Sequence, residues 1–269
     1  MEQDNRLGRL NPDGGVAEWP EFDVNGSAYS IPASRIVFSG VGKSADEMRM
    51  ALNAGILCFN VESEAELIVL NQVAKDMGKI APVSLRVNPD VDAKTHPYIS
   101  TGLKENKFGV PASEAERIYQ SAHLFPHIRF TGLDCHIGSQ LTELEPFLQA
   151  SSKMLKLLEA MQPQGLQIKH LDLGGGLGIR YTNETPPSIK DYVSALCAGT
   201  QQIKQRLLIE PGRSLVGNSG ILLTRVEYLK HTPARNFAIV DAAMNVHTGA
   251  DIDCRSTSTR LAELRGFTT

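Results

Sequence analysis

The stretch KHLDLGGGLGIRY (residues 169–181) joins a short apolar run to three consecutive glycines, and RLLIEPGR (206–213) makes the same change from apolar to polar. The segment between them, residues 189–206, has the apolar spacing of a helix and is predicted to be one. A buried strand, a helix and a second buried strand form the repeating unit of parallel sheets. The stretch therefore predicts an α/β fold.

The same alternation of apolar runs and helical segments extends toward the N-terminus as far as Ile31. The apolar runs are nearly continuous, which is typical of a parallel sheet covered by helices. The predicted strands are Ile36–Ser39, Leu57–Val61, Val83–Asn88, Arg129–His136, Lys169–Leu173 and Leu207–Glu210. The predicted helices are Ser44–Asn53, Glu64–Met77, Ala112–His123, Leu144–Met161 and Ile189–Arg206. Two helix starts have the spacing of a capping box, Ser44 with Glu47 and Ser63 with Glu66.

The two ends of the chain follow other patterns. Residues 1–30 are rich in Gly, Asn, Asp and Pro without a sustained period, and we expect them to be poorly ordered. Gly220–Lys230 and Asn236–Val240 indicate two strands with no helix between them, which predicts the start of a separate β domain. The pattern ends at Asn245.

Composition excludes several classes of function. The 269 residues carry a net charge of −3, which gives no reason to expect nucleic acid or an anionic membrane as partner. No apolar run reaches the length of a membrane span, and the N-terminus lacks the apolar core of a signal peptide. The cysteines lie far apart and form no CxxC pair, which favours reduced thiols and a cytoplasmic location; they are Cys58, Cys135, Cys197 and Cys254.

The polar residues that end the predicted strands are the candidates for function, because α/β barrels place their sites there. Gly174, Gly175 and Gly176 would let backbone amides approach an anion, although a plain tight turn explains them equally well. Glu210 could hold a ring nitrogen protonated and Arg213 could bind a phosphate or carboxylate. An internal Glu–Arg pair is the alternative.

His136 ends another predicted strand. It could stack on a planar cofactor, carry a proton or be a satisfied core histidine. A metal site is not predicted, because no other His or Cys lies at ligand spacing. Serine hydrolysis is not predicted either, since the sequence has no G-x-S-x-G motif.

These motifs together resemble bacterial diaminopimelate decarboxylases, from about Ile31 to Asn245. The motifs CHIGSQ (135–140) and VDAAMN (240–245) resemble those of diaminopimelate decarboxylases more than those of the related ornithine and arginine decarboxylases. The stretches that carry the resemblance are RIVFSGVGKS (35–44), CFNVESEAEL (58–67), SLRVNPDVDAKTHPYISTGLKENKFG (84–109), GLDCHIGSQLTEL (132–144), HLDLGGGLGIRY (170–181), LLIEPGRSLVGNSGILLTRVEYLKH (207–231) and NFAIVDAAMN (236–245).

The resemblance implies an alanine-racemase-like fold, a (β/α)₈ TIM-type barrel followed by a β domain, and pyridoxal 5′-phosphate (PLP) as cofactor. It implies that meso-diaminopimelate is decarboxylated to L-lysine by a homodimer. His136 is expected to stack on the pyridine ring, Ser139 to lie near the phosphate and Glu210 to pair with the ring nitrogen. Arg213 is expected to meet the substrate or the phosphate. Cofactor contacts are also expected at Gly174, Gly175, Gly176 and Gly212, and Arg86 and Asn106–Gly109 match family positions.

The family's Schiff-base lysine stands in a first strand resembling Y-A-V-K-A-N, which this sequence lacks; the first lysine is Lys43. The catalytic cysteine of the family's β domain has no counterpart either, and Cys254 is not assigned its role. We therefore expect an incomplete barrel of six recognisable strands over residues 31–215, the start of a β domain over 216–245 and an unmatched tail over 246–269. A PLP-binding or partner-binding protein without catalysis is the alternative, and whether another lysine takes the cofactor stays open.

Overall fold

The computed structural model describes residues 31–91, 108–161, 165–181, 183–217, 219, 224–233 and 236–241. The expectations for residues 1–30 and for the tail 246–269 lie outside this part of the chain.

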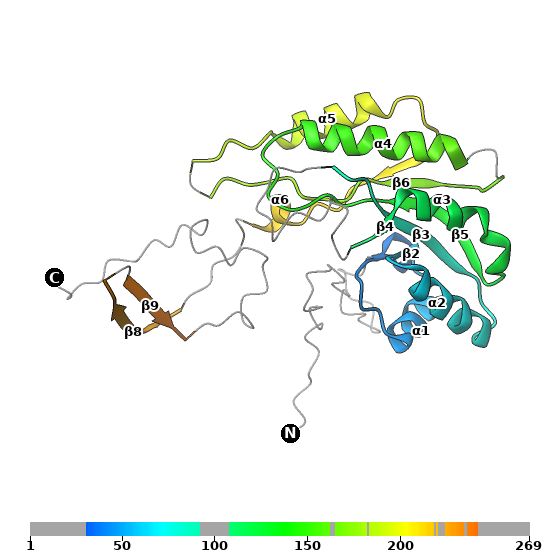
Figure 1. The fold of residues 1–269 in the computed structure, drawn as a ribbon, viewed down its shortest axis with the longest axis horizontal. Coiled ribbons are helices and arrows are strands. Elements are labelled where there is room, and N and C mark those ends of the chain that lie inside the picture. The colour runs from blue at the N-terminus through cyan, green and yellow to red at the C-terminus, as the bar shows by residue number, and fades with distance from the viewer. Residues whose placement is uncertain are drawn as a thin grey trace, which may run out of the picture.

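The described core is a curved parallel sheet with helices along one side (Figure 1). Its strands follow the order β1-β2-β3-β5-β6-β7, and the short β4 pairs with β3. The prediction of six parallel strands is confirmed, and it missed β4. The strands are β1 (Val37–Phe38), β2 (Cys58–Val61), β3 (Ala81–Asn88), β4 (Val110–Pro111), β5 (Ile128–Asp134), β6 (His170–Asp172) and β7 (Arg206–Leu208).

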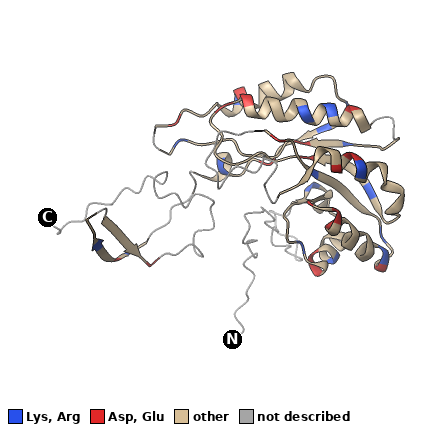
Figure 2. Ribbon diagram, viewed as in Figure 1, with Lys and Arg blue, Asp and Glu red and all other residues tan. Residues whose placement is uncertain are grey.

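The helices alternate with the strands, as expected for an α/β barrel. Consecutive helices pack side by side, α1 against α2, α3 against α4 and α4 against α5 (Figure 1). Figure 2 shows both signs of charge distributed over these outer helices. Their bounds are α1 (Ala45–Ala54), α2 (Glu64–Asp76), α3 (Ala112–Gln120), α4 (Glu145–Met161), α5 (Ile189–Gly199) and α6 (Arg213–Val216), with 3₁₀ turns at Ala33–Arg35 and Ala122–Leu124.

Helix α5 is shorter than the prediction, which ran it to Arg206. It ends at Gly199, where Thr200 Oγ1 donates to the carbonyl of Leu196 at 2.8 Å and closes the last turn. The polar residues that follow lead directly into β7. The periodicity therefore located the helix but not its end.

The core lies between the sheet and the helices. All four residues of β2 are buried, and the long β3 is buried at every position except Pro82. This is the reason that the strands read as continuous apolar runs. Side chains from both layers are fully buried, among them Phe59, Leu85 and Leu133 on strands and Met48, Leu67, Ile118 and Met154 on helices.

The two predicted capping boxes differ in the structure. At α1, Ser44 Oγ accepts from the Glu47 amide and the Glu47 carboxylate accepts from the Ser44 amide, which completes the box. At α2, Ser63 Oγ accepts from the Glu66 amide at 3.1 Å, but the Glu66 carboxylate bonds to Lys43 and to the Glu62 amide. The second box is therefore only half formed, because a buried ammonium takes its carboxylate.

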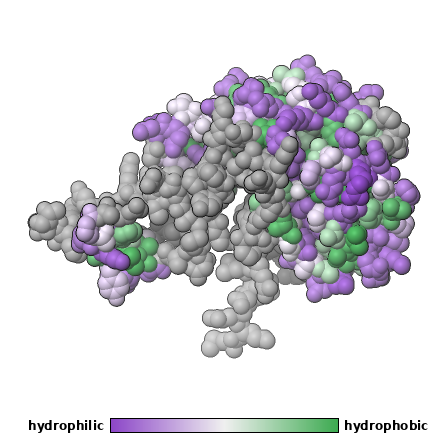
Figure 3. Space-filling view, in the orientation of Figure 1, coloured by the Kyte–Doolittle hydropathy of each residue, from purple (hydrophilic) through white to green (hydrophobic). Residues whose placement is uncertain are grey.

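An antiparallel hairpin follows the parallel sheet. It comprises β8 (Val226–His231) and β9 (Asn236–Val240). The two strands predicted for the start of a β domain are thus observed; the first begins at Val226, and residues 220–223 of the prediction lie outside the described part of the chain. Figure 3 shows hydrophobic surface on this hairpin, and Tyr228 is 71% exposed there. None of the helices among the described residues is both long and apolar enough to cross a bilayer.

Candidate functional site

The carboxyl ends of the parallel strands share one rim of the sheet, and the predicted site residues His136 and Glu210 lie there with further polar residues. Ser39 follows β1, Glu62 follows β2, His136 follows β5 and Glu210 follows β7. Ser39 Oγ donates to Glu210 Oε1 at 3.1 Å and accepts from Asn60 Nδ2 at 3.1 Å. The first and last strands of the sheet order therefore approach each other at this rim, so the sheet is curled as in a barrel.

The glycine triplet after β6 lies against the loops after β5 and β7. A Cβ atom on Gly174 would come within 2.4 Å of the Cys135 carbonyl oxygen, and one on Gly175 within 2.0 Å of the Glu210 carbonyl oxygen. One on Gly176 would meet the Gly138 carbonyl oxygen at 2.1 Å. The triplet is thus required for close packing of three backbone segments, which is more than the tight turn that we considered.

Two amides of the triplet already have acceptors. The Gly174 amide donates to Asp172 Oδ1 at 2.9 Å, and the Gly175 amide donates to His136 Nδ1 at 3.2 Å. A phosphate that uses Gly175 would have to replace His136 as its acceptor. That all three glycines bind phosphate stays a prediction.

His136 is neutral at physiological pH. Burial, together with the nearby Arg86 cation, lowers its pKa to about 3. Since Nδ1 accepts from Gly175, Nε2 carries the ring proton. The imidazole can therefore present an uncharged ring face, and it does not act as a proton carrier near pH 7.

Arg213 begins the short helix α6 and is held over the rim by Gln140. Its Nη1 donates to Gln140 Oε1 at 3.2 Å, and its guanidinium lies 5.5 Å from the centre of the Tyr181 ring. Gln140 has φ +58° and also exchanges hydrogen bonds with the backbone of Ile179. Arg213 and Glu210 thus have different partners, Gln140 and Ser39, in place of the internal pair that the sequence left open.

The remaining predicted residues lie on the same loops. Ser139 is half-buried and follows Gly138, whose carbonyl oxygen lies under Gly176. Gly212 caps α6 and would have room for a Cβ atom, since nothing lies within 4 Å of one. The structure does not by itself assign a ligand to either residue.

A buried ion pair supports the rim beside β3. Arg86 Nη1 donates to Glu62 Oε1 at 2.8 Å, and Glu62 Oε2 accepts from the Gly109 amide at 3.0 Å. The Arg86 guanidinium also lies 4.9 Å from the centre of the Phe108 ring. Of the family positions expected at 106–109, only Phe108 and Gly109 are described, and both contact this pair.

Two acidic residues at the rim were missed by the sequence reasoning. Asp134 ends β5 and Asp172 ends β6, both buried, and their carboxyl oxygens lie within 4.8 Å of each other and of Glu210. Burial, followed by repulsion from its acidic neighbours, raises the pKa of Asp172 to about 8 and that of Asp134 well above its ordinary value. The signal was present in the sequence, because each acid interrupts an apolar strand.

Lys43 was open as a replacement for the family's lysine. Its ammonium donates to the carbonyls of Gly40 and Asn60 at 2.6 and 2.7 Å and to Glu66 Oε1 at 2.8 Å. These three acceptors use all three of its N–H donors. Lys43 is therefore a structural residue in this conformation.

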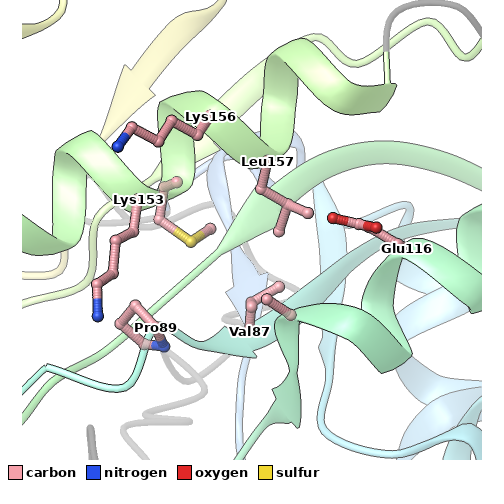
Figure 4. Close-up of a pocket in the computed structure, with 8 residues that line it drawn as sticks. Val87, Pro89, Glu116, Lys153, Lys156 and Leu157 are labelled. Carbon is pink, nitrogen blue, oxygen red and sulfur yellow. The ribbon is translucent and has the colours of Figure 1, made fainter.

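A surface hollow of about 270 Å³ lies elsewhere, between β3, α3 and α4 (Figure 4). Val87, Pro89 and Leu157 line it with the charged side chains of Glu116, Lys153 and Lys156. It shares no lining residue with the rim carboxyls or the glycine triplet. The candidate site is the rim.

Comparisons with known proteins match the chain to one family. The family model "Pyridoxal-dependent decarboxylase, pyridoxal binding domain" matches residues 24–217. A diaminopimelate decarboxylase from Haemophilus influenzae is 57% identical over 214 residues, covering 79% of this chain and 52% of the relative. One from Pseudomonas aeruginosa is 55% identical over 241 residues, covering 90% and 58%.

Solved structures agree with the sequence comparison. The crystal structure of diaminopimelate decarboxylase from Helicobacter pylori, complexed with L-lysine, has a TM-score of 0.72 and 45% identity. The match covers 80% of this chain and 54% of that one. The chain thus spans about half the length of the curated relatives it matches, which have 52% and 58% of their length covered.

Proposed function

Because this chain belongs to the pyridoxal-dependent decarboxylases, through the pyridoxal-binding domain of that family, we propose that it forms the cofactor-binding part of a diaminopimelate decarboxylase. The reaction is the PLP-dependent loss of CO₂ from meso-2,6-diaminopimelate to give L-lysine. The gathering of His136, the glycine triplet, Glu210 and Arg213 on one rim is the observation that carries this proposal. The L-lysine in the related Helicobacter pylori structure supports the choice of product.

The residues of the rim fit PLP. An uncharged imidazole at His136 suits stacking on an aromatic ring. Close backbone packing at Gly174, Gly175 and Gly176 leaves a side-chain-free loop of the kind that receives a phosphate. Glu210 is partly exposed at the mouth and can reach a ring nitrogen, while the carboxyls behind it are buried.

The proposed roles follow from these positions. When bound, PLP supplies an electron sink for the bonding pair that the departing carboxyl group leaves behind. Glu210 holds a proton at the ring nitrogen, and Ser39 orients its carboxyl by a 3.1 Å hydrogen bond. Ser139 and Gly176 bind the phosphate. Gln140 holds Arg213 in place to meet the phosphate or a substrate carboxylate.

A second candidate function is PLP binding or partner binding without catalysis by this chain. The engagement of Lys43 with three acceptors favours it, because a Schiff base needs a free amine lone pair, and this nitrogen is held as an ammonium by the Glu66 carboxylate and two carbonyls. In this case the rim would bind PLP without a covalent link.

We further propose a cytoplasmic homodimer, as for the family. The free thiols of Cys58, Cys135 and Cys197 support a reducing compartment. The exposed apolar residues of the hairpin, such as Tyr228 and Phe237, support burial of this surface in the assembled protein (Figure 3). Sedimentation of the full chain tests the dimer.

The experiment that tests the function combines binding and turnover. The full chain is titrated with PLP by absorbance, and CO₂ release is then measured from carboxyl-labelled meso-diaminopimelate, with ornithine and arginine as comparison substrates. CO₂ from meso-diaminopimelate supports the decarboxylase, and binding without CO₂ supports the second candidate. Absence of PLP binding contradicts both PLP-binding proposals.

A further inference from the structure

Three carboxyl groups lie close together at the rim, and the neighbouring cations and hydrogen-bond donors do not fully balance their negative charges. Asp134, Asp172 and Glu210 each place an oxygen within 4.8 Å of the other two. Asp134 Oδ1 is fully buried and has no hydrogen-bond partner among the described residues. A buried, unpaired carboxyl oxygen is costly, and a shared proton or an incoming positive charge would remove that cost.

The surroundings supply little positive charge. Arg86 is the cation that acts on all three carboxyls, and it is already paired with Glu62 at 2.8 Å. His136 and His170 are neutral, with pKa values lowered by burial to about 3 and about 4. Lys43 is a further cation nearby, and it is paired with Glu66. The thiols of Cys58 and Cys135 and the phenols of Tyr119 and Tyr192 also face the cluster. Hydrogen bonds to the carboxyls come from Ser39, Asn60 and Gly174.

We propose that Asp134 and Asp172 are positioning residues that act through Glu210. The three carboxyls share a stored proton, and Glu210 passes it to the ring nitrogen of the bound cofactor. One O–H bond breaks at a carboxyl group and one N–H bond forms at the ring nitrogen, with no change of oxidation state. The inference rests on the proposed function. It adds two residues, Asp134 and Asp172, that lie behind Glu210 and do not themselves contact the ring nitrogen.

The order of the three residues suits this transfer. Asp134 and Asp172 are buried inside the sheet, whereas Glu210 stands at the mouth where a ligand arrives. Like charges this close cannot all be ionised away from water, so at least one proton stays in the cluster at neutral pH. Asp172 is fixed by the Gly174 amide at 2.9 Å, which holds the cluster against the glycine triplet.

The first test needs no cofactor. Infrared spectra of the full chain at neutral pH should contain the C=O band of a protonated carboxyl group, and Asp172→Asn should weaken it. Asparagine keeps the oxygen that accepts from Gly174, so the loop is retained. Asp76→Asn, an exposed acid at the end of α2 that accepts from Gln72, is the matched control and should leave the band unchanged.

The second test is the pH dependence of PLP affinity between pH 7 and about 9.5, on either side of the pKa of Asp172 at about 8. Above that pKa the cluster no longer holds a proton, and the ring nitrogen of PLP must take its proton from water. The affinity for PLP should therefore fall by up to about tenfold per pH unit, which is the slope expected when binding is linked to one proton. In Asp172→Asn and Asp134→Asn the fall should begin at lower pH, because Glu210 then loses its proton more readily. A purely structural role would lower affinity equally at every pH.

The outcomes separate this inference from the proposed function. PLP binding with the same pH profile in wild type and both variants overturns the inference and leaves the function intact. A chain that binds no PLP contradicts the function, and the infrared band then decides whether the stored proton exists. Should Asp172→Asn fail to fold, Asp134→Asn provides both measurements. A wild-type spectrum without a protonated carboxyl also overturns the inference.

Discussion

The ammonium of Lys43 lies 2.8 Å from Oε1 of Glu66, in a pair whose side chains are 0% and 8% exposed. Two backbone carbonyls complete its shell. This arrangement joins the end of β1 to α2 and fixes the first lysine of the sequence, for which a role in cofactor binding had been left open.

We expect Lys43 to remain unmodified by PLP. After treatment of the full chain with PLP and borohydride, peptide mass spectrometry should find no stoichiometric adduct on this residue, because its nitrogen is a buried, paired ammonium without a free lone pair to attack the aldehyde. The exposed Lys75 serves as the reference for nonspecific labelling. A single stoichiometric adduct on Lys43 would contradict the structural role.

The same pair predicts a loss of stability. Lys43→Met should lower the free energy of unfolding by about 3 kcal/mol, because it leaves the Glu66 carboxylate buried without its partner. Urea denaturation measures the change. The double variant Lys43→Met/Glu66→Leu should recover part of the loss, and Lys75→Met should have little effect. Equal stability of Lys43→Met and wild type would be inconsistent with a buried pair.

Replacement of Gly175 should disable the rim without unfolding the protein. Its Cβ atom would lie 2.0 Å from the Glu210 carbonyl oxygen, so alanine must push the loop after β7 away and with it the Glu210 carboxyl. We expect Gly175→Ala to weaken PLP binding at least tenfold in an absorbance titration. Gly199→Ala is the control, since nothing lies within 4 Å of a Cβ atom there. Similar affinities for the two variants would exclude this role of Gly175.

Gln140 should position Arg213 through their direct hydrogen bond. Gln140→Leu removes the oxygen that accepts from Arg213 at 3.2 Å, together with the two hydrogen bonds to the Ile179 backbone, while filling a similar volume. We expect weaker affinity for PLP or a higher KM for meso-diaminopimelate, with an effect of about 1 kcal/mol for the lost hydrogen bond. Gln140→Glu keeps an acceptor and should retain more affinity than leucine does. The order of the two variants is the decisive observation.

His170 predicts a dependence of stability on pH. Burial lowers its pKa from 6.5 to about 4, so the unfolded chain binds the proton more readily than the folded chain between these values. The contribution of the neutral ring is complete above pH 6.5 and is lost as pH falls from 6.5 toward 4.

Other groups titrate in the same range, and the rim carboxyls act in the opposite direction. The measurement is therefore the difference in unfolding free energy between wild type and His170→Asn at several pH values. That difference should shrink on acidification, by at most about 1.4 kcal/mol per pH unit. A difference that grows as pH falls would show that His170 is protonated in the folded state.

Much of the fold could be predicted from sequence because the buried strands are continuous apolar runs. The run at Cys58–Val61 is buried at all four positions, and its residues have no helical spacing that would indicate a different element. The end of α5 was missed because apolar spacing locates a helix but not its last turn, which lies at Gly199. The strand at Val110–Pro111 was missed because two residues have no period to detect.

The site was predicted less completely than the fold. His136, the glycines, Glu210 and Arg213 came from strand ends and from family resemblance, and the structure places them on one rim. Asp134 and Asp172 were passed over although each interrupts an apolar run, because that signal does not tell which groups the acid faces, and those groups lie far away in the sequence. Gln140 was missed for the same reason, since its partner is 73 positions distant.

The hydrogen bond from Ser39 to Glu210 joins residues 171 positions apart. Contacts of such high sequence separation form late, because a long stretch of chain must be ordered before they can close. During synthesis, the strand at Val37–Phe38 leaves the ribosome well before β7 exists. The rim at the first strand therefore stays open until β7 has been made, and this is the stage at which its unpaired strands are most exposed to aggregation.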